Sequence, residues 1–162
     1  MVTVGDTAPE FTVPLANGDV ESFTLSTALA DGPVVLAFFP GAFTRVCTNE
    51  MCAFEDDLSG FESVGAQVYG VSVDSPFALN EFRAQNDLSF GLLSDFEREV
   101  IDAYDVRTDF ADIGVHGLAQ RAVFVVDADR TVTYVWIGEH PGVEPDYESV
   151  REAAAAAAET DG

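Results

Sequence analysis

The spacing of apolar residues along the chain alternates between two periods, one typical of strands and one typical of helices. Continuous apolar runs at residues 34–39 and 122–126 predict buried strands. Apolar side chains recur every three or four positions from about residue 47 to residue 64, which predicts a helix. Ser75 followed by Pro76 indicates a second helix, because serine accepts at the N-cap and proline fits the first helical position.

Turns and shorter segments complete the pattern. An Asn-Gly-Asp tripeptide at residues 17–19 separates two strand-like segments and predicts an N-terminal hairpin. Alternation on the last strand predicts that Val132, Tyr134 and Trp136 share one face. We see no linker that would divide residues 1–162, so the order predicts one three-layer α/β domain. The other expected elements are strands at 67–73, 121–127 and 131–138, an extended piece at 90–95, and helices at 98–104 and 152–159.

The charge balance is strongly acidic and narrows the range of partners. The chain has 29 acidic residues against 7 basic ones, all arginine, and its net charge is −22. Nucleic acids and anionic membranes are poor partners for such a surface. Self-repulsion destabilises the folded state, and salt relieves it because the Debye length falls to about 3 Å at about 1 M. Acidic, lysine-free composition of this kind resembles that of proteins from extreme halophiles.

Segments that would direct the chain to a membrane are not evident. The longest apolar runs have the length of strands, far short of a membrane span. The N-terminus lacks a basic region followed by an apolar stretch, so we expect no signal peptide and a cytoplasmic location.

Both cysteines lie in one short segment, "PGAFTRVCTNEMC", at residues 40–52. Cys47 follows a buried strand and a turn, near the expected start of a helix, where backbone N–H groups and the helix dipole favour a thiolate. The hydroxyl of Thr44 can donate to the sulfur or accept from a substrate, and Pro40 rigidifies the turn.

A nearby cation would stabilise the thiolate further. At about 4 Å and an effective dielectric near 20, one positive charge is worth about 4 kcal/mol to an anion. Arg45 is adjacent in sequence but lies in a loop, and Arg121 opens a buried strand whose start can reach the same sheet edge. The residues alone leave both open, with some preference for Arg121.

The spacing of Pro40, Thr44 and Cys47, P-x-x-x-T-x-x-C, resembles the active-site motif of peroxiredoxins. Four further segments resemble that family in the same order along the chain: "GDTAPEFTV", "VVLAFFPGAFTRVCTNEM", "GVSVDSPFALNEF" and "RAVFVVDADRTVTYV". The resemblance implies a thioredoxin-like fold with a central mixed sheet flanked by helices. It implies that Arg121 is the catalytic arginine and that Glu50 orients the arginine, although an acid in the first turn of a helix also has a purely local role.

The family resemblance also implies the chemistry and the partners. A peroxide oxidises the Cys47 thiolate to sulfenic acid, while Thr44, Arg121 and backbone N–H groups hold the peroxide oxygens. The implied partners are a peroxide and a thioredoxin-like or other thiol reductant; no cofactor or metal is implied, and homodimers are common in the family. A collar of Phe43, Val46, Phe77 and Phe110 would admit organic hydroperoxides.

Cys52 follows Cys47 by five residues, about 8.6 Å between Cα atoms on a regular helix, which is too far for a disulfide. In the bacterioferritin-comigratory (Q-type) subfamily a cysteine at this spacing resolves the sulfenic acid after the helix unwinds. The segment "GAFTRVC" looks more like the alkyl hydroperoxide reductase E type, which often uses an external thiol. Otherwise Cys52 is a buried apolar residue. We expect Cys52 to resolve Cys47.

Three other functions compete with a peroxidase. A non-catalytic binding domain on the same fold would be indicated by loss of Thr44 or Arg121, and both are present. A dithiol–disulfide oxidoreductase would usually carry C-x-x-C, whereas the spacing here is C-x-x-x-x-C. A metal site would need His116 and His140 beside the cysteines, but both histidines lie in glycine-rich segments without ligand spacing.

Overall fold

The computed structural model describes residues 2–140 and 142–159, which form strands and helices in a mixed α/β order. The strands are β1 (Thr12–Ala16), β2 (Val20–Thr24), β3 (Val34–Phe38), β4 (Gln67–Ser72), β5 (Leu92–Ser94), β6 (Arg107–Phe110), β7 (Val115–Ala119), β8 (Ala122–Val126) and β9 (Val132–Ile137). The helices are α1 (Leu25–Ala28), α2 (Arg45–Asp56), α3 (Leu58–Ser63), α4 (Pro76–Asn86), α5 (Glu99–Ala103) and α6 (Tyr147–Glu159), with short 3-10 turns at Leu29–Asp31 and Ala111–Ile113.

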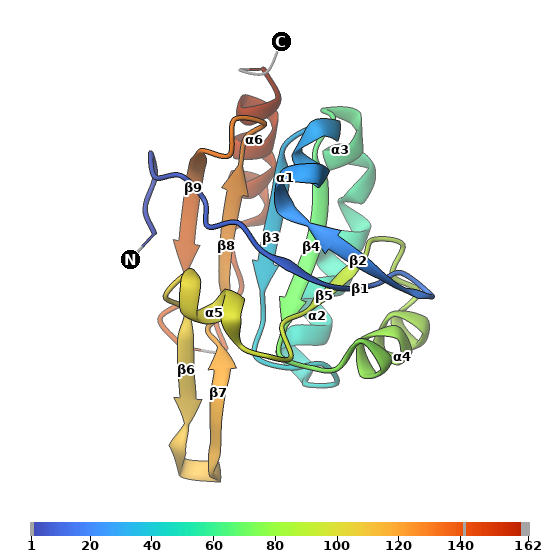
Figure 1. The fold of residues 1–162 in the computed structure, drawn as a ribbon. Helices are drawn as coiled ribbons and strands as arrows, with labels where there is room; N and C mark the ends of the chain where they lie inside the picture. The colour runs from blue at the N-terminus through green and yellow to red at the C-terminus, as the bar shows by residue number, and fades with distance from the viewer. Residues whose placement is uncertain (1, 141, 160–162) are drawn as a thin grey trace.

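Within the described residues, seven strands form one mixed sheet in the order β2-β1-β5-β4-β3-β8-β9 (Figure 1). Strands β3, β4 and β5 run parallel, and β8 runs antiparallel to β3. Phe38, at the end of β3, is therefore paired with Ala122, at the start of β8. This register brings the loop after β3 and the residue before β8 to the same edge of the sheet.

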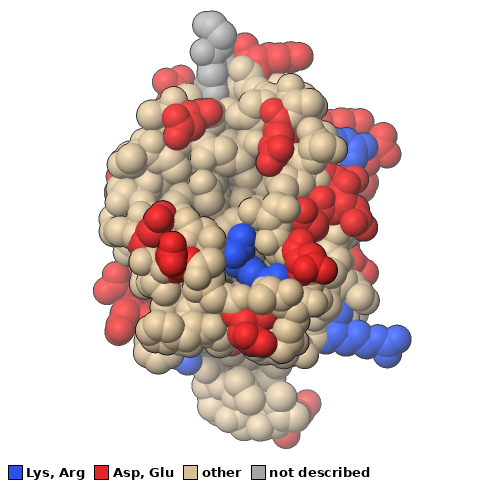
Figure 2. Space-filling model, turned by 90° about the vertical axis from the view of Figure 1, so that its right-hand side faces the viewer, with Lys and Arg blue, Asp and Glu red and all other residues tan. Residues whose placement is uncertain are grey.

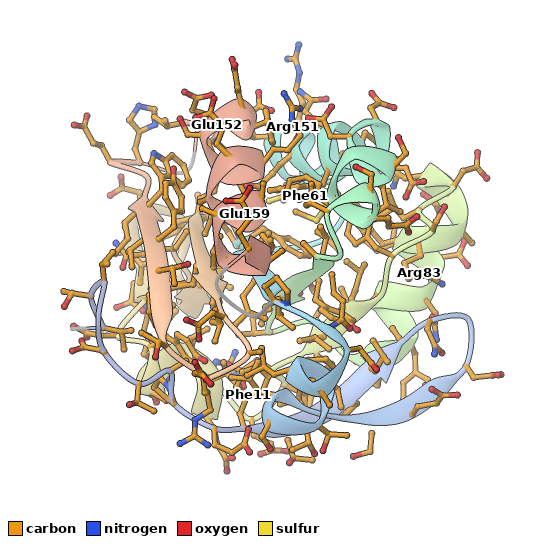
Figure 3. All side chains as sticks on the ribbon, turned by 90° about the horizontal axis from the view of Figure 1, so that it is seen from above. Phe11, Phe61, Arg83, Arg151, Glu152 and Glu159 are labelled. Carbon is orange, nitrogen blue, oxygen red and sulfur yellow. The ribbon has the colours of Figure 1, made fainter. Side chains whose placement is uncertain are left out.

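The sheet is covered on both faces, which the uninterrupted apolar sequence of its central strands requires. In β3, Val34, Leu36 and Phe38 pack toward α1, α5 and the N-terminal segment, where Phe11 is buried (Figure 3). Val35, Ala37 and Phe39 face the opposite way, toward α2, α3, α4 and α6. Phe61 of α3 fills this second core (Figure 3). Glu152 is exposed on α6, whereas Arg151 extends from α6 toward α3 and forms an ion pair with Asp57.

The predicted α/β fold with a central mixed sheet, an N-terminal hairpin and flanking helices is confirmed, with three corrections. The single helix expected at 47–64 is two helices, because the chain tightens at Asp57, where the N–H of Gly60 donates to the Asp57 carbonyl at 2.9 Å. Val132 does not share a face with Tyr134 and Trp136. An irregularity in the β8–β9 register turns Val132 into the other core.

The third correction is the hairpin of β6 and β7, which the sequence pattern did not predict. It forms a separate two-stranded sheet and projects away from the main sheet (Figure 1). Most of its side chains are exposed or half-exposed, so neither strand carries the apolar alternation that identifies a half-buried strand.

The molecular surface reflects the composition. Acidic side chains are scattered across the face seen in Figure 2, where basic ones are few. Among the helices of the described residues, none combines the length and the apolarity that crossing a bilayer would take.

Candidate active site

Cys47 lies in the first turn of α2, and its side chain is almost fully buried, with 1 % of the residue exposed. The turn before Cys47 is held by a hydrogen bond to Asp74 and contains a residue with unusual backbone geometry. The N–H of Ala42 donates to Oδ2 of Asp74 at 2.8 Å, and the Asp74 carboxylate also accepts from the Ser72 hydroxyl at 2.7 Å. Phe43 has the left-handed φ of 68°, which is uncommon for a bulky residue.

Arg121 immediately precedes β8, the antiparallel neighbour of β3. The pairing of Phe38 with Ala122 places Arg121 next to the turn that leads to Cys47. Its Nη2 donates to Sγ of Cys47 at 3.1 Å, and its Nη1 donates to Oε1 of Glu50 at 2.9 Å. The side chains of Arg121 and Glu50 are 1 % and 0 % exposed. One buried guanidinium therefore bridges the thiol and a carboxyl one turn further along α2.

The carboxyl of Glu50 occupies an unusual electrostatic position. Burial raises the pKa of Glu50 to about 8, even though the charge and hydrogen bond of Arg121 act to lower it. Its second oxygen, Oε2, has no hydrogen-bond partner among the described residues. A protonated Glu50 would leave the positive charge of Arg121 to the sulfur of Cys47.

Glu144 and Tyr147 extend this cluster, and sequence reasoning missed both. The hydroxyl of Tyr147 donates to Oε1 of Glu144 at 2.7 Å, and its ring packs edge-on against Phe54 with centroids 5.2 Å apart. Burial and this hydrogen bond raise the pKa of Tyr147, and the charge of Glu50 adds to the effect. No motif marks either residue, because both precede the alanine-rich segment from which the last helix was predicted.

The predicted site residues Pro40, Thr44, Cys47, Glu50 and Arg121 come together at one edge of the sheet. Two hollows meet there and share Pro40, Phe110 and Arg121 as walls. The hollow that contains Cys47 has a volume of about 200 Å³ and includes Thr44 at its rim. Of the expected collar, Val46 and Phe110 line this hollow; Phe43 and Phe77 do not.

Thr44 is exposed, and its hydroxyl donates to the carbonyl of Gly41 at 2.9 Å rather than to the sulfur. Because that bond uses the hydroxyl hydrogen, the oxygen of Thr44 is an acceptor toward the hollow.

Cys52 lies on the same uninterrupted helix and is unbonded to Cys47. Its Sγ is 3.9 Å from Oδ1 of Asn86 on α4, and the residue is half-buried. Burial raises the pKa of the Cys52 thiol, and the charges of Asp56 and Glu55 raise it further.

The histidines are not assembled into a metal site. His116 is exposed on β7 with its Nδ1 3.6 Å from Oδ1 of Asp109, and Nδ1 of His140 accepts from the N–H of Gly142 at 3.1 Å. The described part of the chain holds no group of three or more histidine, cysteine or acidic residues placed to bind a metal ion.

A buried thiol hydrogen-bonded to a guanidinium, at the bottom of an open hollow, is suited to nucleophilic attack on a small electrophile. Comparison with known proteins identifies the family of this chain. The AhpC/TSA family model matches residues 4–135. The chain belongs to the peroxiredoxins of that family. The predicted enzyme class, a thiol-dependent peroxidase, is thereby confirmed.

Individual relatives and solved structures agree with this family. A Mycobacterium tuberculosis protein named as a peroxiredoxin is 40 % identical over 136 residues, or 81 % of this chain and 82 % of that protein. Peroxiredoxin Bcp of Escherichia coli is 30 % identical over 133 residues, covering 82 % and 83 % of the two chains. The crystal structure of peroxidoxin BcpB from M. tuberculosis matches with a TM-score of 0.81 and 32 % identity over 99 % and 98 % of the chains.

Proposed function

We propose that Cys47 is the residue that attacks the peroxide. The thiolate attacks the terminal oxygen of a hydroperoxide, the S–O bond forms as the O–O bond breaks, and the sulfur loses two electrons to become sulfenic acid. The released alkoxide takes a proton from solvent and leaves as an alcohol; hydrogen peroxide releases water. The observation that supports this most directly is the 3.1 Å hydrogen bond from Arg121 to Sγ of Cys47.

The other motif residues have separable roles in this proposal. Arg121 stabilises the thiolate and then the negative charge that develops on the leaving oxygen. Glu50 fixes the guanidinium in its plane through the 2.9 Å bond to Nη1. The Thr44 oxygen accepts from the peroxide O–H, and Pro40 closes one wall of the hollow against water.

Turnover of peroxide tests these roles together. Hydrogen peroxide consumption with excess dithiol should be lost in Cys47→Ser. In Arg121→Lys it should fall by about 100-fold, the size of effect seen when one such donor is removed. Lysine keeps the charge but cannot bond to sulfur and carboxyl at once, because it lacks the planar fork of arginine. Full activity of Cys47→Ser would refute the proposal.

We propose further that Cys52 resolves the sulfenic acid. Its thiolate attacks the Cys47 sulfur, a disulfide forms and water leaves; a thioredoxin-like dithiol then reduces the disulfide by exchange. The two residues sit five positions apart on the continuous helix α2, so at least its first turns must unwind before the sulfurs can meet. The alternative is an external thiol that reduces the sulfenic acid directly.

Mass spectrometry after one equivalent of peroxide distinguishes the two cycles. A disulfide appears as the loss of two hydrogens, and it should be absent in Cys52→Ser, which gains one oxygen instead. A wild-type protein that gains one oxygen and keeps it until an added thiol is present would favour the external resolver.

Composition and exposed aromatic residues support proposals about where the protein works and how it assembles. We propose that residues 1–162 form a single domain that works in a salt-rich cytoplasm, consistent with the net charge of −22.

Phe43, Phe77 and Phe96 are more than half exposed, and each follows one of the parallel strands β3, β4 and β5. This apolar edge supports a homodimer, which sedimentation equilibrium in high KCl would reveal and Phe77→Ser should weaken.

A further inference from the structure

Arg45 differs from the other arginines in its contacts with the described part of the chain. The other six arginines each bond to a carboxylate or a backbone carbonyl: Arg83, Arg98, Arg107, Arg121, Arg130 and Arg151. No hydrogen bond or ion pair joins Arg45 to any residue that the structure describes, and its side chain is exposed. In a chain with 29 acidic residues, an unpaired guanidinium is the exception.

The second distinguishing feature of Arg45 is its position. It lines the hollow that contains Cys47, two residues before the cysteine on α2. Pro40, Val46 and Phe110 contribute apolar walls to the same hollow. The hollow is therefore lined by a reactive sulfur, by apolar side chains and by an exposed arginine that makes no bond to the described residues.

The adjoining hollow has the opposite character. It shares Pro40, Phe110 and Arg121 with the first, but its outer wall carries the carboxylates of Asp109 and Glu139. A negatively charged substituent would be repelled on that side and attracted on the side of Arg45. The two hollows thus differ in the charge that they favour on a substrate bound at Cys47.

From this arrangement we propose that Arg45 is a specificity-determining residue, which favours hydroperoxides that carry an anionic group on a short apolar body. The inference rests on the proposed role of Cys47 as the attacking thiolate. The hydroperoxide would reach Cys47 and Arg121, the apolar body would lie against Val46 and Phe110, and the anionic group would meet the Arg45 guanidinium. Anionic and neutral hydroperoxides would react with Cys47 in the same way, and Arg45 would affect only how readily each is bound.

The expected effect is modest because Arg45 is exposed. An exposed ion pair of this kind corresponds to a preference of about two- to fivefold. Raising KCl from about 0.1 M to about 1 M should reduce the preference, since the Debye length falls from about 10 Å to about 3 Å. In a salt-rich cytoplasm the preference would be small, which makes low salt the sensitive condition for its measurement.

A matched pair of substrates tests the inference: cumene hydroperoxide with a para carboxylate, and the methyl ester of the same compound. The readout is the ratio of kcat/KM for the acid to that for the ester. Arg45→Gln should lower this ratio by about two- to fivefold, mainly through KM, and Arg45→Lys should restore it. Arg151→Gln is the control, because it removes one charge beside Asp57, about 18 Å away at the other end of α2.

Each outcome bears on one proposal. A ratio in Arg45→Gln equal to that of the wild type would overturn the role of Arg45, as would an equal fall in Arg151→Gln. Failure of the wild-type enzyme to reduce either aromatic hydroperoxide, while it reduces hydrogen peroxide, would also overturn it and leave the proposed function intact. Peroxide reduction that survives Cys47→Ser would instead remove the proposed function itself.

Discussion

Replacing Glu50 by glutamine should change how the stability of the protein depends on pH. The carboxyl is fully buried, Oε1 accepts one hydrogen bond from Arg121, and Oε2 has no partner in the described structure. Burial raises the pKa of Glu50 from 4.5 to about 8 in the folded state. In the unfolded chain the carboxyl is solvated and has its ordinary pKa. Between these values the folded protein therefore binds a proton that the unfolded chain has released.

The sign of the effect follows from this difference in bound protons. Below the unfolded pKa both states are protonated, and the stability that comes from the group is fully present. As the pH rises toward about 8, the unfolded state is favoured by its ionised carboxyl, so the free energy of unfolding falls. The full shift corresponds to an upper limit of roughly 5 kcal/mol across this window. Glutamine keeps an oxygen for the bond from Arg121 and does not titrate.

The measurement is urea unfolding of the wild type and Glu50→Gln at several pH values between 5 and 8, at one high KCl concentration. The free energy of unfolding of the variant, relative to the wild type, should rise by a few kcal/mol over this range. Glu62→Gln, which removes an exposed carboxyl on α3, should run parallel to the wild type. Parallel curves for Glu50→Gln would show that Glu50 is already ionised at pH 5 and would refute the reasoning.

Three further outcomes are expected. Burial and the charges of Asp56 and Glu55 raise the pKa of Cys52, so disulfide formation after oxidation should become faster as the pH rises above 7, and faster still in Asp56→Asn. Stopped-flow fluorescence would measure the rate of disulfide formation, and a rate independent of pH would exclude attack by the Cys52 thiolate. Phe61→Ala empties a fully buried position between α3 and the sheet and should lower the free energy of unfolding by about 3–5 kcal/mol in denaturant titrations; a loss below about 1 kcal/mol would mean that the core closes around the gap. Asp74→Ala removes the acceptor of the Ala42 N–H and should lower kcat/KM for hydrogen peroxide by about tenfold, because the turn that precedes Cys47 is then misplaced. Unchanged kinetics in a variant with a native circular dichroism spectrum would show that Asp74 does not position this turn.

The sequence predicted the parts of the site that belong to strongly patterned elements. Strand β3 is uninterruptedly apolar, α2 has a clear helical period, and β8 is apolar again, so the edge where Cys47 meets Arg121 follows from sheet topology. The preference for Arg121 over Arg45 agrees with the observed 3.1 Å contact to sulfur.

The parts that were missed come from segments with weak patterns or from contacts between distant segments. The hairpin of β6 and β7 was missed because its strands are largely exposed and carry no strand signal, although Phe110 itself was expected near the thiol. Tyr147 and Glu144 reach the cluster because α6 packs behind α2, which no local period can show. The bulge that turns Val132 depends on pairing between β8 and β9, and an ideal alternation cannot anticipate it.

The cluster around Arg121 explains how a thiolate can be stabilised in a protein of net charge −22. The acidic surface is exposed to solvent, where molar salt screens it within a few ångströms. Arg121 and Cys47 are buried beside each other, so the same salt leaves their interaction largely intact. Burial also raises the pKa of Glu50, which makes this carboxyl a weaker competitor for the guanidinium than an exposed carboxylate would be. High salt therefore reduces the repulsion from the acidic surface and leaves the buried contact between Arg121 and Cys47 in place.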